Sequence, residues 1–358
     1  MINKIFSFLY DTTLVNIVRK PDTIEVYIET ISQKKVKFSE TKTFILNDSY
    51  HDSLLYDFIH QFATDTPFYY IATLDISNDQ GAIPTCDKKE FSKFKDLSTS
   101  QYFCIDKLWT CYTSKIDLQA QIGFMDELGL DFIFSPFVVL KDFFSDKISG
   151  PIALYVLILE SAIIVAVFRD SKLLYGDYID MSLDMEDNTD ISSLEDDAMS
   201  SEEMGLDESV NLDQIDLDGD LDFDDELEDM DDFDNIEDLD SIEELGTEDL
   251  EQKLEENYEE ASSDEIEEYE QEKAQEEEST KDFHRFSLIQ NSLANYYKDP
   301  RFESDFIENI YVADDVRVSN DFKRYIQEEM FLNVYMRSIE VEIELCNLTK
   351  MELGLHNV

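Results

Sequence analysis

The stretch GPIALYVLILESAIIVAVFRDSKLLYGDYID, residues 150–180, decides how this chain folds. Residues 150–168 are almost all apolar, which is about the length of a membrane-spanning helix. Glu160 lies in the middle of that run, where a carboxylate costs about 2.5–3.5 kcal/mol on insertion scales. The run is rich in β-branched residues, and polar residues at 160–161 and 170–172 interrupt it as turns. We therefore predict an antiparallel three-stranded meander, rather than a transmembrane or buried helix, with strands at Ile152–Leu159, Ile163–Phe168 and Leu173–Ile179.

The segments around this meander repeat one order of elements twice. Before it, periodicity and caps predict a meander over residues 13–46 with a turn at Lys20-Pro21-Asp22, a helix at His51–Thr64, a strand at Phe68–Asp75, a helix from Ser114, a strand at Asp131–Phe134 and a helix at Phe137–Phe144. After it, they predict a helix at Asp282–Asp299, a strand at Phe306–Ala313, a helix from Ser319 to Met330 and a strand at Phe331–Leu345. This order predicts an α/β protein built from two similar halves.

Residues 181–280 form a highly acidic tract with 45 acidic and two basic residues. The whole chain has a formal net charge of −56, which opposes binding to nucleic acids. Such charge density predicts an insert that is mostly disordered. Its apolar residues recur at every third position, which makes no single helical face and suits a disordered segment that binds a basic or amphipathic partner. The alternative is a solvating tract without a partner. The candidate contact residues are Leu227, Met230, Phe233, Ile236 and Leu239.

The cysteines and histidines predict neither disulfides nor a metal site. Cys86, Cys104, Cys111 and Cys346 form no CxxC pair, which fits free, buried thiols in a reducing compartment. The four histidines are scattered, and the aspartate-rich run at 216–227 lacks the glycine and glutamate that a calcium-binding loop needs. The apolar run at the N-terminus is too short for the core of a signal peptide.

Two further segments carry a resemblance to a known family. WTCYTSKIDLQAQIGFMDELGLDFIFSPFVVLKDFF, residues 109–144, gives strand, helix, Gly-Leu, strand, Pro-Phe and helix, and FYYIATLDISNDQGAIP, residues 68–84, gives strand, loop and strand. Together with the 150–180 meander, they resemble the PilM and GspL branch of the actin-like ATPase superfamily. The resemblance implies an actin-like, ribonuclease H-like fold of two halves. It also implies a first half at 1–148 with an additional subdomain at about 77–134, a second-half meander at 149–180, the acidic insert at 181–281 and the rest of the second half at 282–358.

The chain departs from this family at the loops that would hold a nucleotide. Actin-like ATPases bind phosphates with glycine-containing hairpins, because glycine lets backbone N–H groups approach closely. The positions that the resemblance aligns with these loops contain no glycine: Asp11, Thr12 and Thr13 at the first hairpin, Glu160 and Ser161 at the second, and Asp314 and Asp315 on the adenosine side. We therefore expect no catalytic residue, no cofactor and no metal ion. The alternative is a nucleotide-binding ATPase of the FtsA or PilM type.

The resemblance also implies a function in protein assembly. PilM-like proteins are cytoplasmic scaffolds that bind the N-terminal cytoplasmic peptide of a PilN-like bitopic inner-membrane protein. We expect a non-catalytic scaffold of this kind in a type IV pilus, a type II secretion-like assembly or a polar flagellar motor. It would lie in the cytoplasm, peripheral to the inner membrane through its partners, and a homo-oligomeric ring is expected by analogy. In a third hypothesis, the acidic tract alone acts as a decoy or chaperone.

Overall fold

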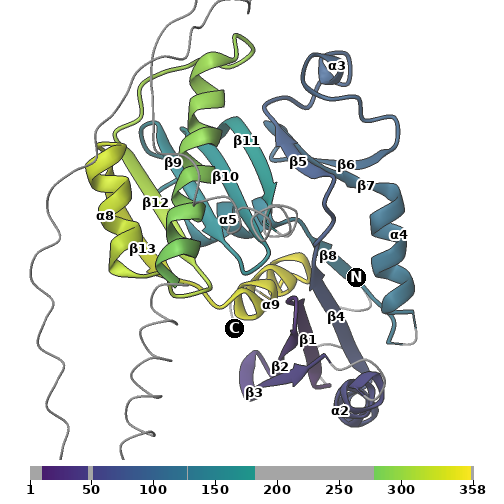
Figure 1. The fold of residues 1–358 in the computed structure, drawn as a ribbon. Helices are drawn as coiled ribbons and strands as arrows, with labels where there is room; N and C mark the ends of the chain where they lie inside the picture. The colour runs from purple at the N-terminus through teal and green to yellow at the C-terminus, as the bar shows by residue number, and fades with distance from the viewer. Residues whose placement is uncertain (1–9, 47–50, 127, 182–277, 356–358) are drawn as a thin grey trace, which may run out of the picture. The chain divides into compact units, whose positions relative to one another are not determined.

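The computed structural model describes residues 10–46, 51–126, 128–181 and 278–355 (Figure 1). The predicted disorder of the acidic tract, and its candidate contact residues Leu227, Met230, Phe233, Ile236 and Leu239, lie outside the described residues. Within the described residues, no helix is long and apolar enough to span a membrane. The stretch 150–180 forms three strands, so the meander predicted from the sequence is confirmed.

The meander is the core of a five-stranded sheet in the order β11-β10-β9-β12-β13. Its strands are β9 (Ala153–Ile158), β10 (Ala162–Arg169), β11 (Lys172–Asp180), β12 (Asn309–Asp314) and β13 (Asn333–Ser338). Every side chain of β9 is buried. Since successive side chains of a strand point to opposite faces, both faces of this sheet are covered. The helix over residues 278–298 and α8 (Asn320–Glu329) pack on one face, which explains the continuous apolar run in the sequence (Figure 1).

The first half of the chain forms a second sheet with the same plan. Its strands are β1 (Thr12–Arg19), β2 (Thr23–Ser32), β3 (Lys35–Ile45), β4 (Phe68–Leu74) and β8 (Phe132–Phe134), in the order β3-β2-β1-β4-β8. In each sheet, three antiparallel strands are followed by two parallel ones. Helix α2 (His51–Asp65) packs on the first sheet through Leu55, Phe58 and Ile59. The duplicated plan is the actin-like α/β fold, as predicted.

The last helix of each half packs on the sheet of the other half. Helix α5 (Pro136–Phe143) starts at Ser135, whose hydroxyl accepts a hydrogen bond from the Phe137 amide at 3.3 Å. Proline at the first helical position fits because its missing N–H would be unpaired there. Phe137 then packs with β9 and β10 of the second half. Helix α9 (Val341–Glu352) places Cys346 against Leu14 and Ile31 of the first sheet.

One predicted strand is wrong. The run Phe331–Leu345 is a strand only as far as Ser338, and α9 begins at Val341. The alternation through Val341, Ile343 and Leu345 indicated a strand. However, Val341, Leu345 and Leu348 are also spaced as one face of a helix, and this is the face that is buried. Short apolar runs fit both periods, and tertiary packing decides between them.

A third, smaller sheet lies between β4 and β8 in the sequence. Its strands are β5 (Gln80–Ile83), β6 (Ser100–Ile105) and β7 (Trp109–Ser114), accompanied by α3 (Phe91–Phe94) and α4 (Lys115–Phe124). A disulfide joins Cys86 to Cys104 within this segment, so the prediction of four free thiols is wrong for these two residues. The two sulfurs meet because the antiparallel β6–β7 pair folds back on the loop that follows β5, a contact that the spacing of 18 residues does not reveal. Cys111 and Cys346 are free and buried, as expected.

Candidate functional site

Two of the three predicted loop positions lie beside each other in the fold. Glu160 and Ser161 form the turn between β9 and β10, which is closed by the Leu159 amide donating to the Ala162 carbonyl at 2.9 Å. Asp314 ends β12, and its carboxylate accepts hydrogen bonds from the Val316, Arg317 and Val318 amides. Asp315 follows at once, and its amide donates to the Ile158 carbonyl at 3.2 Å. The end of β12 is therefore joined to the end of β9, beside the hairpin.

The first predicted hairpin is misplaced. Asp11, Thr12 and Thr13 lie at the start of β1, whereas the hairpin that follows β1 is formed by Lys20-Pro21-Asp22. Thr13 bonds to Thr30, and Asp11 pairs with Lys37 at 2.7 Å, so these residues serve the opposite end of the strand. Eight strand residues at about 3.3 Å each separate the two ends by roughly 26 Å. The prediction took the residues at the start of β1 for the hairpin turn that follows its end, although the Lys-Pro-Asp turn signal is visible in the sequence.

The actual first hairpin carries a lysine that crosses to the second half. The Lys20 ammonium lies 3.0 Å from an Asp315 carboxylate oxygen and 2.9 Å from one of Glu25 on β2. The side chains of Lys20 and Asp315 are only 15% and 4% exposed. Neither this hairpin nor the Glu160–Ser161 turn contains a glycine. A salt bridge thus joins the two halves at the point where β1 and β12 both end.

Burial and the neighbouring charges set the protonation of this cluster. Burial favours the neutral form of Lys20, but Glu25 and Asp315 outweigh it and raise the pKa of the ammonium. Burial also raises the pKa of Asp315, against the opposing effect of Lys20. Glu342, at the start of α9, is 5% exposed. Burial, together with the negative charges of Glu25 and Asp315, raises the pKa of Glu342 to about 7.

The raised pKa of Glu342 predicts that the protein loses stability as the pH rises toward 8. The folded state holds this proton up to about pH 7, whereas the unfolded chain releases it near 4.5. The folded state therefore binds more protons between these values, so the free energy of unfolding falls with rising pH, by about 2 kcal/mol from pH 5.5 to 8. Glu342→Gln should remove this dependence and be the more stable protein at pH 8. Urea unfolding of both proteins at the two pH values measures it, and equal pH slopes would contradict the assignment.

A second candidate site is a groove between α4 and the end of β4. Helix α4 has no fully buried residue, although Ser114 caps it through the Asp117 amide, as predicted. Ile122 and Phe124 of this helix are 37% and 40% exposed. Beside it lies a cavity of about 340 Å³. It is lined by Arg19, Thr73, Ile76, Ser77, Asn78, Asp117, Ala120, Gln121, Phe124 and Met125.

The groove combines an apolar wall with a few polar groups. The Arg19 guanidinium lies 5.0 Å from the centre of the Phe124 ring. The Gln121 side chain donates to the Leu74 carbonyl at 3.4 Å. Gly123 has open space where a Cβ would lie, so nothing in the described part of the chain packs on that side of α4. An apolar wall with a few polar groups is the usual composition of a binding site.

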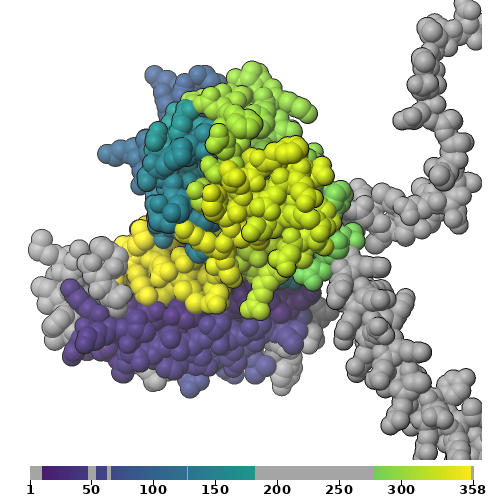
Figure 2. Space-filling view, turned by 90° about the vertical axis from the view of Figure 1, so that its left-hand side faces the viewer, coloured from purple at the N-terminus to yellow at the C-terminus, as the bar shows by residue number. Residues whose placement is uncertain are grey.

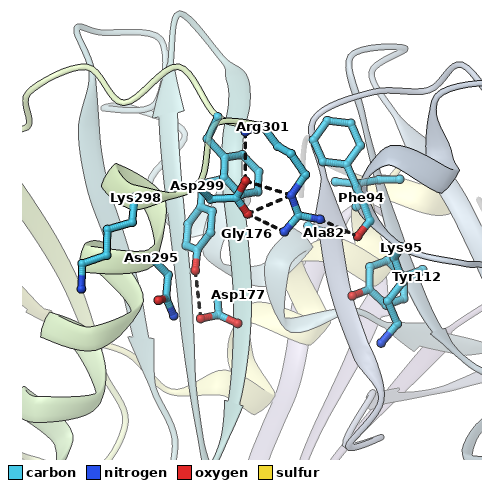
Figure 3. A pocket seen from close by; sticks show the side chains of 13 residues that line it. Ala82, Phe94, Lys95, Tyr112, Gly176, Asp177, Asn295, Lys298, Asp299 and Arg301 are labelled. Atoms are coloured by element: carbon cyan, nitrogen blue, oxygen red, sulfur yellow. Dashed lines mark hydrogen bonds and ion pairs between the residues drawn. The ribbon is translucent and has the colours of Figure 1, made fainter.

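A larger cavity of about 400 Å³ lies between the small sheet and β11 (Figure 3). Arg301 bridges its walls, because its guanidinium pairs with Asp299 and donates to the Phe94 carbonyl at 3.1 Å. Next to Phe94, the Lys95 ammonium pairs with Asp79 at 2.7 Å. Where β11 crosses β5, the cavity is lined by Gly176, and a Cβ there would lie 2.8 Å from that of Ala82. Arg301 with Asp299, and Lys95 with Asp79, thus hold the two walls of this cavity.

The described residues contain no group of three or more His, Cys, Asp or Glu side chains that could hold a metal ion. The carboxylates nearest to such a group are Glu25, Asp315 and Glu342, and Lys20 already supplies a positive charge to the first two. Lys20 therefore compensates part of the negative charge of this cluster within the protein.

Two family models match the chain. The family model described as domain of unknown function (DUF8341) matches residues 154–354, and domain of unknown function (DUF8569) matches residues 10–141. No curated protein matches the chain.

Solved structures resemble the chain only at low sequence identity. A PilM–PilN type IV pilus biogenesis complex is 11% identical with a TM-score of 0.41, and the match covers 92% of this chain and 89% of that one. MreB 5 of Spiroplasma citri, bound to AMPPNP, is 8% identical with a TM-score of 0.41, over 96% and 97%. The ethanolamine utilization protein EutJ from Carboxydothermus hydrogenoformans is 9% identical with a TM-score of 0.38, over 96% and 89%.

Proposed function

The chain belongs to the family described as domain of unknown function (DUF8341), and we propose that it is a non-catalytic scaffold with an actin-like fold. The Lys20–Asp315 salt bridge supports this proposal, because it fills the place between the halves with protein charges. Nucleotide phosphates would meet the carboxylates of Asp314, Asp315 and Glu160 there, without glycine hairpins to present N–H groups. The bridge holds the two halves together, which suits a scaffold because a scaffold does not need the halves to move apart.

A thermal melt with and without Mg-ATP tests the absence of a nucleotide site. A ligand at about 100 times its Kd would stabilise the protein by about 2.7 kcal/mol, a shift of several degrees in Tm. We expect no shift at millimolar ATP, with the same Mg²⁺ concentration in both samples because the acidic tract binds cations. A clear shift with ATP would make the protein a nucleotide-binding ATPase of the FtsA or PilM type.

We place partner binding in the groove beside α4. Its occupant in this proposal is the cytoplasmic N-terminal peptide of a PilN-like bitopic inner-membrane protein. The exposed side chain of Phe124 would contact the apolar residues of such a peptide, and Arg19 would contact its polar groups. The protein would then act in a type IV pilus, a type II secretion-like assembly or a polar flagellar motor, at the cytoplasmic side of the inner membrane. A homo-oligomeric ring and a basic partner of the acidic tract belong to the same proposal.

Phe124→Asp should weaken binding of that peptide by about tenfold or more, because a carboxylate in an apolar contact costs on the order of 1–3 kcal/mol. Phe103→Asp is the matched control, since Phe103 is 63% exposed on β6 and does not line the groove. Fluorescence anisotropy with a synthetic peptide of the host's PilN-like protein measures both variants. Equal binding of the peptide by both variants would contradict its assignment to this groove.

A further inference from the structure

The outer edge of β3 is the longest free strand edge in the described part of the chain. β3 runs for 11 residues, from Lys35 to Ile45, and pairs only with β2. Ten of its eleven side chains are exposed, and Phe44 is the buried one. Strands β1 to β3, in purple, lie on one outer face of the molecule in Figure 2. A free edge of this length is a template on which another strand can pair.

The backbone groups that point outward can be assigned. The Leu46 amide donates to the Asp22 carbonyl of the neighbouring strand at 2.7 Å. Alternate residues of an antiparallel strand bond to opposite sides, so Phe44, Lys42 and Glu40 also face β2. The register is unbroken from Ile45 to Ser39. The outward backbone groups are therefore those of Ser39, Thr41, Thr43 and Ile45.

The charge of this edge is opposite to that of the chain. Residues 34–45 contain Lys34, Lys35, Lys37 and Lys42 with one acidic residue, Glu40, in a protein with a net charge of −56. Lys37 pairs with Asp11, whereas Lys34 and Lys35 have no side-chain partner among the described residues. Two copies paired along β3 would bring lysines together, which is unfavourable. The strand that this edge attracts is an acidic one.

Exposed apolar side chains at both ends of the edge add contact area. Val36 and Phe38 are 48% and 39% exposed, and Ile45 is 60% exposed. Phe38 is fixed by stacking on Phe62 of α2, with ring centres 5.6 Å apart. A rigid aromatic ring beside free backbone groups and unpaired lysines is the combination that β-strand addition uses.

We propose that β3 is a docking edge for an extended acidic segment of a partner protein, which adds to the first sheet as a further strand. This edge belongs to β3, whereas the groove beside α4 is lined by Arg19 of β1 and Thr73 of β4, away from that edge in the sheet order. The protein can therefore bind one partner in the groove and another at the edge.

Amide hydrogen exchange of the full chain tests this proposal. The probe is a synthetic ten-residue peptide in which glutamate alternates with valine and threonine, and its control has lysine in place of glutamate. The acidic peptide should slow exchange at Thr41 and Thr43 by about tenfold or more and leave Glu40 and Lys42 unchanged, since only the former pair has outward amides. Equal protection of both sets, or none, would overturn strand addition.

A variant pair completes the test. Thr41→Pro removes one outward N–H. It should weaken binding of the acidic peptide by about tenfold, because one hydrogen bond is lost, whereas Thr41→Ala should bind the peptide as the wild type does. A melting temperature close to that of the wild type shows that Thr41→Pro still folds. Equal binding by Thr41→Pro, or by the lysine control peptide, would contradict the proposal. A wild-type dimer that Thr41→Pro dissociates would instead assign the edge to a second copy.

Discussion

Lys20→Met should destabilise the protein by about 3–5 kcal/mol, because it leaves buried carboxylates without their counter-ion. Lys20 is the cation that contacts both Glu25 and Asp315, and the Asp315 side chain is 4% exposed. Glu342, whose negative charge adds to theirs, is 5% exposed. Urea unfolding at pH 7.5 measures the loss. At pH 5 the loss should be smaller, since the raised pKa values of Asp315 and Glu342 let these groups take up protons.

A second substitution separates this mechanism from a general packing defect. Adding Asp315→Asn to Lys20→Met removes one orphaned charge and should recover part of the lost stability. Lys172→Met is the matched control, because its ammonium lies 3.8 Å from Glu303 at a site where both side chains are about half exposed. Such a surface pair contributes about 0–1 kcal/mol. If Lys20→Met cost no more than Lys172→Met, the bridge would not hold the two halves together.

Reducing the Cys86–Cys104 disulfide should cost about 3 kcal/mol, the chain-entropy value for a loop of this length, which spans 18 residues. The outer part of the small sheet depends on the link because the separate cluster there has three buried apolar residues, Ile83, Phe91 and Leu97, whereas Trp109 and Cys111 pack into the main core. Melting with and without reductant measures the effect, and amide exchange should rise first in β6 and α3.

The variant Cys86→Ser, Cys104→Ser provides the control. Its melting temperature should match that of the reduced wild type and should not respond to reductant. In the reducing compartment that the proposed function implies, the two residues would be thiols for most of the time. A reductant-insensitive wild type would show that the link contributes nothing to the stability of the small sheet.

The elements built on local chemistry were predictable. The β-branched runs and polar turns of residues 150–180 predicted β9, β10 and β11 with an error of one residue at each end. The serine caps at Ser114, Ser135 and Ser319 each mark the start of a helix, because their hydroxyl groups satisfy amides that are adjacent in the sequence. The same short range explains why the Glu160–Ser161 turn and the end of β12 at Asp314 were placed correctly.

The errors involve contacts between distant parts of the chain. Lys20 lies hundreds of residues from Asp315 and Glu342 in the sequence, and no periodicity shows that they meet. The helix α9 was predicted as a strand because its buried face is set by β1 and β2, on the other half of the molecule. Cys86 and Cys104 were predicted to be free thiols because their pairing depends on how β6 folds back. The first hairpin was misplaced because the resemblance was aligned by the start of a strand rather than by its turn.

The packing of the last helix of each half on the sheet of the other half has a consequence for the synthesis of the protein. The face of the first sheet that includes Leu14 and Ile31 is covered by α9, whose residues are synthesised about 300 residues later. A nascent chain therefore carries this apolar face uncovered until α9 has left the ribosome. The tract at 181–280, with its 45 acidic residues, is translated before α9, so the waiting chain already carries most of its negative charge. Repulsion between such like-charged nascent chains would oppose contacts between their uncovered faces until α9 of each chain has packed.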